Sequence, residues 1–300
     1  MKIENDVLSL LTEGCKLSKD EKAKYYKIGR GYYYPRYEWF ALYEIDQFKL
    51  RILATASQTN SDAYFSGVTA AIAYGCPMPA GIAKFPFRPE ITHTKSRRVK
   101  SKYATYKVST VPCECEIINI CGISATVMSP PTFIVDVAKN EPLINVFPIA
   151  EYCLYERIVS KFDIENAIIN QRYTQGISRV RKIFKLLSEL SESVAESATK
   201  AILIENNLEL PIQQRKVGKY RADFLWPALK LVLEFDGFDK FINLGKRDII
   251  ENLENMFERD DCFASNGYRI MHVLYSYLLH PEKLVKLLKD NSIPTRNYGL

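Results

Sequence analysis

The chain has 300 residues, enough for two or three domains with a substantial core. Its composition, with 47% hydrophobic and 25% charged residues, is ordinary for a soluble protein. No apolar run approaches the roughly 20 residues that span a bilayer, and the N-terminus lacks the charged-then-apolar pattern of a signal peptide. These features argue against a membrane protein, and we expect a cytoplasmic location. The formal net charge of +6 is modest and matters only where basic residues cluster.

Seven cysteines are scattered along the chain, and this odd number does not suggest a disulfide framework. Cys113 and Cys115 form a Cys-x-Cys pair that would lie on one face of a strand, so a soft metal is one interpretation. No second pair stands at the spacing of a zinc finger, and reduced cysteines are therefore the default.

Residues 1–60 have the outline of a winged helix-turn-helix. A short helix is expected over residues 5–12, and Ser18 followed by Glu21 is a capping box that begins a second helix. Gly29-Arg30-Gly31, followed by three tyrosines, predicts a tight hairpin that would serve as the wing. The expected second helix carries Lys19, Lys22, Lys24 and Lys27. Lysines can simply solvate a small helix, but basic residues also flank the turn, and we favour contact with DNA.

Residues 61–160 are expected to form a mixed α/β segment. An Ala-rich helix over 65–75 ends at Gly75-Cys-Pro77, strands follow over 83–92, 103–108 and 113–120, and Ser129-Pro130-Pro131 opens a helix over 132–139. The basic run over 95–102 is either a phosphate-binding hairpin or a solvated loop. The candidate nucleic-acid-binding residues of the two segments are Lys22, Lys24, Lys27, Arg30, Arg36, Arg97, Arg98 and Lys100.

These two segments resemble the N-terminal and middle parts of AbiEi-type antitoxin proteins. The resemblance is carried by the Gly29-Arg30-Gly31-Tyr hairpin, the helix from Ser66 to Ala71 with Gly75, and the Ser129-Pro130 turn before Asp136. Pro131 departs from it, because that family commonly has arginine there. Residues 161–190 are polar and helical, with an apolar stripe that includes Val180 and Ile183, and we expect a helical connector.

Acidic residues in the C-terminal third stand where strands rarely tolerate them. Residues 220–236 predict two short strands joined by a Trp-Pro turn, and the period of two places Glu234 and Asp236 on one face. Asp223 falls near the end of the neighbouring strand. Acids on a sheet often just face solvent, but carboxylates gathered on adjacent strands need a cation, and a hard ion such as Mg²⁺ is the natural one.

The region from Ser193 to Leu288 resembles the very-short-patch-repair-like branch of the PD-(D/E)xK restriction-endonuclease superfamily. The matching segments, in chain order, are Ser193 to Lys200 for the opening helix, Leu210 to Val217 for the entry into the first strand, Glu234-Phe-Asp236-Gly237 for the core motif, and Glu258 to Asp261 with Gly267 to Ile270 for the closing helix, glycine break and final strand. The resemblance covers about a third of the chain.

The resemblance implies roles for particular residues. Asp223 and Glu234 would bind Mg²⁺ or Mn²⁺ together with the backbone carbonyl of Phe235, and Glu196 would reach the metal directly or through water. Lys240 would stabilise charge on the phosphate or orient the attacking water, and Gln214 would support the site. Asp236 stands where the superfamily has lysine, so Lys240 or the metal must do that lysine's work. His272 and His280 are expected to be structural.

We therefore expect a multidomain α/β chain. Its parts would be a winged helix-turn-helix (1–60), a mixed α/β segment (61–160), a helical connector (161–190) and a restriction-endonuclease-like domain with a central mixed sheet (191–300), and the tail beyond Asp290 would be loosely ordered. The expected function is a metal-dependent DNA endonuclease, in phage defence or a toxin-antitoxin-like setting. The alternative is an antitoxin-like repressor with an inactive nuclease fold. Expected partners are DNA, or else RNA, a second copy for cutting both strands, and a cognate toxin or other protein.

Overall fold

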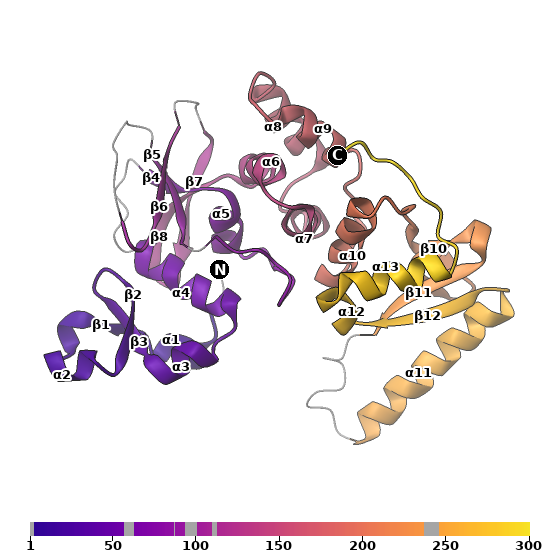
Figure 1. Ribbon diagram of the computed structural model, residues 1–300, viewed down its shortest axis with the longest axis horizontal. Coiled ribbons are helices and arrows are strands. Elements are labelled where there is room, and N and C mark those ends of the chain that lie inside the picture. Colours follow the sequence, from indigo (N-terminus) through magenta and orange to yellow (C-terminus); the bar gives the residue numbers. More distant parts are fainter. Residues whose placement is uncertain (1–2, 57–62, 87, 94–100, 110–112, 237–245) are drawn as a thin grey trace. The chain divides into compact units, whose positions relative to one another are not determined.

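The computed structural model describes residues 3–56, 63–86, 88–93, 101–109, 113–236 and 246–300, with the backbone alone at 236 and 246–252. It is a mixed α/β chain that divides into two compact units, residues 1–185 and 186–300, and contains three sheets in the described ranges (Figure 1). The prediction of a multidomain α/β fold is confirmed. Within those ranges no helix is both long and apolar enough to cross a membrane.

A small three-stranded sheet with short helices forms the start of the N-terminal unit. Its strand order is β1-β3-β2, and the elements are α1 (Asn5–Ser9), β1 (Thr12–Glu13), η1 (Gly14–Lys16), α2 (Lys19–Lys22), β2 (Tyr25–Gly29), β3 (Tyr32–Pro35) and α3 (Arg36–Ala41). The hairpin at Gly31 is confirmed, and so is the capping box, in which Ser18 and Glu21 exchange hydrogen bonds.

Two helix predictions in this region were too long. The second helix ends at Lys22, and Lys27 lies in β2, because the aromatic residues from Tyr25 onward pair with β3. The first helix ends at Ser9, because Thr12 pairs with Tyr33. The lysines predicted on one helix are therefore divided between a helix end and the hairpin.

Helix α4 (Glu44–Ala56), which the sequence analysis did not identify, joins this sheet to the next one. Its buried residues include Phe48, Leu50 and Ile52, and it packs against β2, α5 (Gly67–Tyr74) and β8 (Ile123–Met128). The N-terminal sheet and the middle segment are thus packed within one compact unit.

The middle segment is a five-stranded sheet of order β6-β5-β4-β8-β7. The remaining strands are β4 (Ala63–Phe65), β5 (Glu90–His93), β6 (Thr105–Val108) and β7 (Cys115–Ile120). The strand predicted over 83–92 was wrong in length, because Pro86 and Pro89 lack the amide hydrogen that a strand ladder uses. Phe65 ends β4 rather than beginning the helix, which ends as predicted at Gly75 with φ +106°.

Four helices complete this unit: α6 (Pro130–Asn140), α7 (Leu143–Tyr155), α8 (Lys161–Asn170) and α9 (Ile177–Phe184). The predicted connector consists of α8 and α9, which both pack on α6. Val180 and Ile183 of α9 are buried, as the apolar stripe predicted. The Arg179 guanidinium donates to the backbone oxygens of Ala138 and Glu141 at the end of α6, which ties α9 to that helix.

The C-terminal unit is built on a mixed four-stranded sheet of order β12-β11-β10-β9. Its elements are α10 (Val194–Glu205), β9 (Ile212–Val217), β10 (Tyr220–Trp226), η2 (Pro227–Leu229), β11 (Leu231–Asp236), α11 (Lys246–Ser265), β12 (Arg269–Leu274), α12 (Ser276–Leu279) and α13 (Pro281–Asp290). Strands β9, β10 and β11 are antiparallel, and α11 leads into β12, which is parallel to β11. In Figure 1, α11 lies on one side of this sheet, and α10, α12 and α13 lie on the other.

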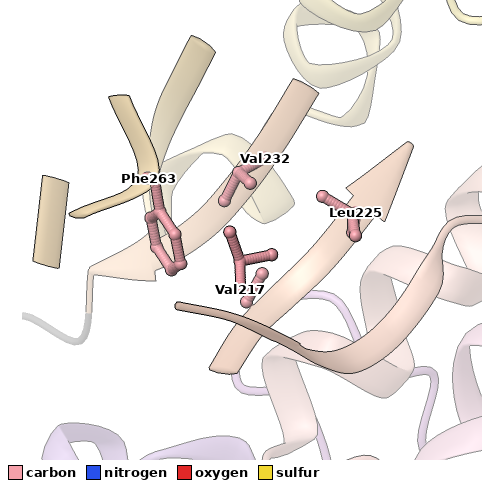
Figure 2. Close-up of a cluster of buried hydrophobic side chains, with 5 residues drawn as sticks. Val217, Leu225, Val232 and Phe263 are labelled. Carbon is pink, nitrogen blue, oxygen red and sulfur yellow. The ribbon is translucent and has the colours of Figure 1, made fainter. Parts of the chain in front are cut away.

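A hydrophobic cluster fastens α11 to the sheet. Figure 2 shows Val217, Leu225 and Val232 of three strands gathered with Phe263 of α11, whose side chain is fully buried. The expectation of a loose tail is wrong, because the Tyr298 hydroxyl donates to the Leu208 carbonyl at 2.8 Å and accepts from the amide of Leu210 at 3.0 Å. The position of α11 matters because this helix also reaches the acidic residues.

Candidate active site

Asp223 of β10 and Glu234 of β11 lie side by side, because the register pairs Phe224 with Leu233. The amide of Asp223 donates to Glu234 Oε1 at 3.1 Å, and the amide of Phe235 donates to Asp223 Oδ2 at 3.0 Å. Each carboxylate is therefore held by a backbone N–H of the opposite strand. Glu234 is 5% exposed, so a negative charge here needs compensation. The predicted gathering of these two acids is present.

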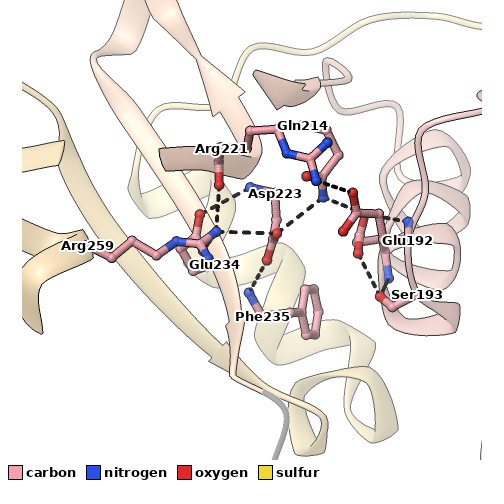
Figure 3. Close-up of polar contacts among 9 residues, drawn as sticks. Glu192, Ser193, Gln214, Arg221, Asp223, Glu234, Phe235 and Arg259 are labelled. Carbon is pink, nitrogen blue, oxygen red and sulfur yellow. Dashed lines mark hydrogen bonds and ion pairs between the residues drawn. The ribbon is translucent and has the colours of Figure 1, made fainter. Parts of the chain in front are cut away.

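The guanidinium of Arg259, from α11, contacts both carboxylates (Figure 3). Its Nη2 forms an ion pair with Glu234 Oε2, lies 3.6 Å from Asp223 Oδ1, and donates to the carbonyl of Arg221 at 2.6 Å. Arg259 precedes Phe263 by four residues, so the two share a helix face, and its Cζ lies 5.7 Å from the Phe263 ring centroid. Sequence reasoning missed this residue, because its spacing from Phe263 shows a shared helix face but not which strands that face covers.

Gln214 links the acid pair to Glu196. Its amide Nε2 donates to Asp223 Oδ1 at 3.3 Å and to Glu196 Oε2 at 3.2 Å. Gln214 has φ +52°, an uncommon conformation for a residue other than glycine, at the position of β9 opposite Asp223. The structure thus brings Glu196 into the site through a side-chain amide, in the supporting role that the sequence analysis gave to Gln214.

Glu196 is fixed in the first turn of α10. Its carboxylate accepts from the Ser193 hydroxyl at 2.9 Å and from the Glu192 amide at 3.2 Å. Burial, with a smaller effect of the Asp223 charge, raises the pKa of Glu196 from 4.5 to about 7. Near neutral pH, the charge of the network therefore depends on whether Glu196 carries a proton.

This shift predicts a pH dependence of stability. Between pH 4.5 and about 7, the folded chain keeps the Glu196 proton that the unfolded chain releases, so stability falls as pH rises through this window. The full shift corresponds to at most about 3 kcal/mol. In Glu196→Gln, the change in unfolding free energy between pH 5 and 8 should shrink by up to that amount, as measured by denaturant unfolding. The exposed-residue control Glu254→Gln should keep the wild-type dependence, and an unchanged profile in Glu196→Gln would refute the assignment.

His272 lies on β12, in register with Glu234 of the parallel strand β11. Its Nε2 is 3.0 Å from Asp260 Oδ2, and Asp260 follows Arg259 on α11. The expected structural role of His272 stays a prediction, and the structure places this residue on the strand next to Glu234. His280 instead lies 3.4 Å from the exposed Glu282.

Two predicted site residues fall beyond the described side chains. Asp236 is the last residue of β11, and its backbone alone is described. Lys240 and Gly237 lie outside the described residues. The roles expected for Asp236 and Lys240 therefore stay predictions.

Lys22, Lys24, Lys27, Arg30 and Arg36, which were predicted to contact nucleic acid, lie in or next to the N-terminal hairpin. Lys22 and Lys27 lie over the Tyr33 ring, at 5.9 and 5.6 Å from its centroid. The amide of Arg36 donates to the Lys24 carbonyl at 3.1 Å, which brings these two residues together. Arg30 stands exposed at the hairpin turn. Arg97, Arg98 and Lys100 lie outside the described residues.

Comparison with known proteins adds a likeness but no activity. No family model matches the chain. Two proteins of Mycobacterium tuberculosis, from two strains and each described as an uncharacterized protein, are 26% identical to it over 126 residues, which is 40% of this chain and 46% of each relative. The chain thus spans less than half the length of these curated relatives.

Proposed function

We propose that the chain is a DNA-binding, divalent-metal-dependent nuclease that hydrolyses phosphodiester bonds. The observation that carries this proposal is the pair of carboxylates, Asp223 and Glu234, held together on adjacent strands by backbone amides. Two acids in a largely buried position repel each other, and replacing buried ionic groups by well-packed apolar residues is often neutral or stabilising, so their presence calls for a reason. Their presence next to Glu196 favours a role in binding a cation.

The donor set fits a hard divalent ion in part. Carboxylate oxygens are the ligands that Mg²⁺ prefers, and each oxygen of Asp223 and Glu234 can accept more than the contact it already makes. Within the described residues, no three His, Cys, Asp or Glu side chains converge as a metal-binding group. Glu196 reaches the pair through Gln214. A metal would therefore rest on two carboxylates, with water or backbone oxygens completing its shell.

Each residue of the site would have a distinct role in hydrolysis. A bound Mg²⁺ lowers the pKa of a coordinated water and offsets charge that builds on the phosphate. Asp223 and Glu234 would hold the ion, and the amides of Asp223 and Phe235 would keep both carboxylates aimed at it. Gln214 would hold Asp223 in place and couple it to Glu196.

DNA contact is proposed for the basic residues around the hairpin. Lys24, Lys27, Arg30 and Arg36 are exposed, and such side chains bind phosphates without regard to sequence. A surface of this kind would raise the local concentration of the substrate for the nuclease site. Phage defence and a toxin-antitoxin-like setting are the biological contexts that we propose for it.

One observation favours a second function. Arg259 already neutralises part of the charge on the acid pair, as expected if the site needs no metal. The chain would then be an antitoxin-like DNA-binding repressor that keeps a nuclease-like fold for packing or partner binding.

Cleavage assays separate the two functions. Supercoiled plasmid, linear duplex, single-stranded DNA and RNA would be incubated with the full-length chain in Mg²⁺, Mn²⁺ or excess chelator. The nuclease proposal expects cutting of at least one substrate that stops with the chelator. Tight DNA binding without cutting of any substrate, in the presence of either metal, would contradict the nuclease proposal and support the repressor function.

A further inference from the structure

The acid pair of the C-terminal unit has a cation already in contact with it. Arg259 Nη2 touches an oxygen of each carboxylate, Oδ1 of Asp223 and Oε2 of Glu234. The other oxygen of each carboxylate is bound to a backbone amide. Arg259 therefore contacts the carboxylate oxygens that face away from these two amides, and it shares Asp223 Oδ1 with the side-chain amide of Gln214. Figure 3 shows its guanidinium beside both carboxylates.

The contact of Arg259 with the acid pair is important because it offsets negative charge. The Glu234 side chain is 6% exposed and that of Asp223 is 19% exposed, so their charges are poorly screened by water. A guanidinium is the most weakly hydrated cation that a protein supplies, and it lowers the cost of keeping both acids ionised. A divalent ion would do the same with twice the charge, at the same oxygens.

The guanidinium is not fully satisfied in this position. Within the described part of the chain, Arg259 Nε is buried and has no hydrogen-bond partner, and an unmade hydrogen bond of this kind is costly. The side chain is nevertheless 31% exposed, so water lies within its reach. Moving the guanidinium outward would hydrate Nε and compensate for part of the lost ion pairs.

We propose that Arg259 is an exchangeable counter-ion of the acid pair. It offsets part of the negative charge of Asp223 and Glu234 in the metal-free protein, and it moves off the two oxygens that it contacts when a divalent metal binds. This inference rests on the proposed function. It adds that the guanidinium of Arg259 competes with the metal ion for the carboxylate oxygens, so that Arg259 lowers the affinity of the site for metal. Arg259 is thus a positioning residue that keeps both carboxylates ionised and in place while no metal is bound.

The test is the affinity of the metal-free, full-length chain for Mn²⁺, measured by titration calorimetry rather than by cleavage. Arg259→Met removes the charge and keeps an unbranched side chain, so Mn²⁺ should bind about 10–100-fold more tightly than to wild type, as expected for loss of a charged hydrogen bond. Arg259→Lys keeps the charge and should give an affinity close to wild type. Arg269→Met, an exposed arginine of β12, is the control and should change nothing.

Thermal melts would show whether Arg259→Met is folded. The variant should melt at a lower temperature than wild type without metal and gain more from added Mn²⁺, because the ion then supplies the missing charge. Equal Mn²⁺ affinity in wild type and Arg259→Met would overturn the inference while leaving the nuclease proposal standing. Weaker binding in Arg259→Met would also overturn it. If neither the wild type nor any of the variants bound Mn²⁺, both the counter-ion inference and the nuclease proposal would be overturned.

Discussion

Replacing Glu234 by glutamine, or Asp223 by asparagine, is expected to slow metal-dependent DNA cleavage by at least about 100-fold. Each change keeps the shape of the side chain but removes half of the charge that would hold the ion. A bound metal contributes several kcal/mol of transition-state stabilisation, and about 2.7 kcal/mol already corresponds to a 100-fold change in rate. The measurement is the initial rate of plasmid nicking at a fixed Mn²⁺ concentration.

Matched controls decide whether a loss is specific. Glu254→Gln changes an exposed acid of α11 and should cut at the wild-type rate. Asp223→Asn and Glu234→Gln should both fold, since the new side-chain amides can still accept hydrogen bonds from the backbone amides. Circular dichroism would check that they do. Full cleavage by both folded variants would place the chemistry elsewhere in the molecule.

Phe263→Ala is expected to lower the unfolding free energy of the C-terminal unit by about 3–5 kcal/mol. Phe263 is fully buried among Val217, Leu225 and Val232, and alanine would leave a cavity that the strands cannot close. Because Phe263 also fastens α11 to the sheet, the variant should loosen the contact of Arg259 with the acid pair. Denaturant unfolding of the full-length chain, followed by circular dichroism, measures the loss.

The same helix offers a control for that substitution. Phe257 is 61% exposed, and Phe257→Ala should change stability by no more than about 0.5 kcal/mol. If both phenylalanine variants lost stability equally, the cluster would not be what holds α11 in place.

The acid pair could be predicted from the sequence because its determinants are local. A period of two over 231–236, a Trp-Pro turn and a facing strand together place Asp223 against Glu234. Arg259 could not be predicted in the same way, since its contact depends on how α11 packs on the sheet. His272 needed the parallel pairing of β11 with β12, which no short-range pattern reveals.

The N-terminal unit shows the same division between local and long-range determinants. Ser18 with Glu21 and the glycines of the hairpin act within a few residues, and both features were predicted correctly. The helix that begins at this capping box was predicted to include Lys27, but cross-strand pairing of Tyr26 with Tyr34 places Lys27 in β2. The resemblances to repair-type nucleases and to AbiEi-type antitoxins stay predictions.

Anomalous diffraction would show directly whether Mn²⁺ binds at Asp223 and Glu234. Crystals of the full-length chain with a DNA oligonucleotide would be grown at the Mn²⁺ concentration used for cleavage. We expect an anomalous peak within coordination distance of both Asp223 and Glu234, with the Arg259 guanidinium moved off their oxygens. Arg259 still on both carboxylates, with no peak beside them, would contradict it.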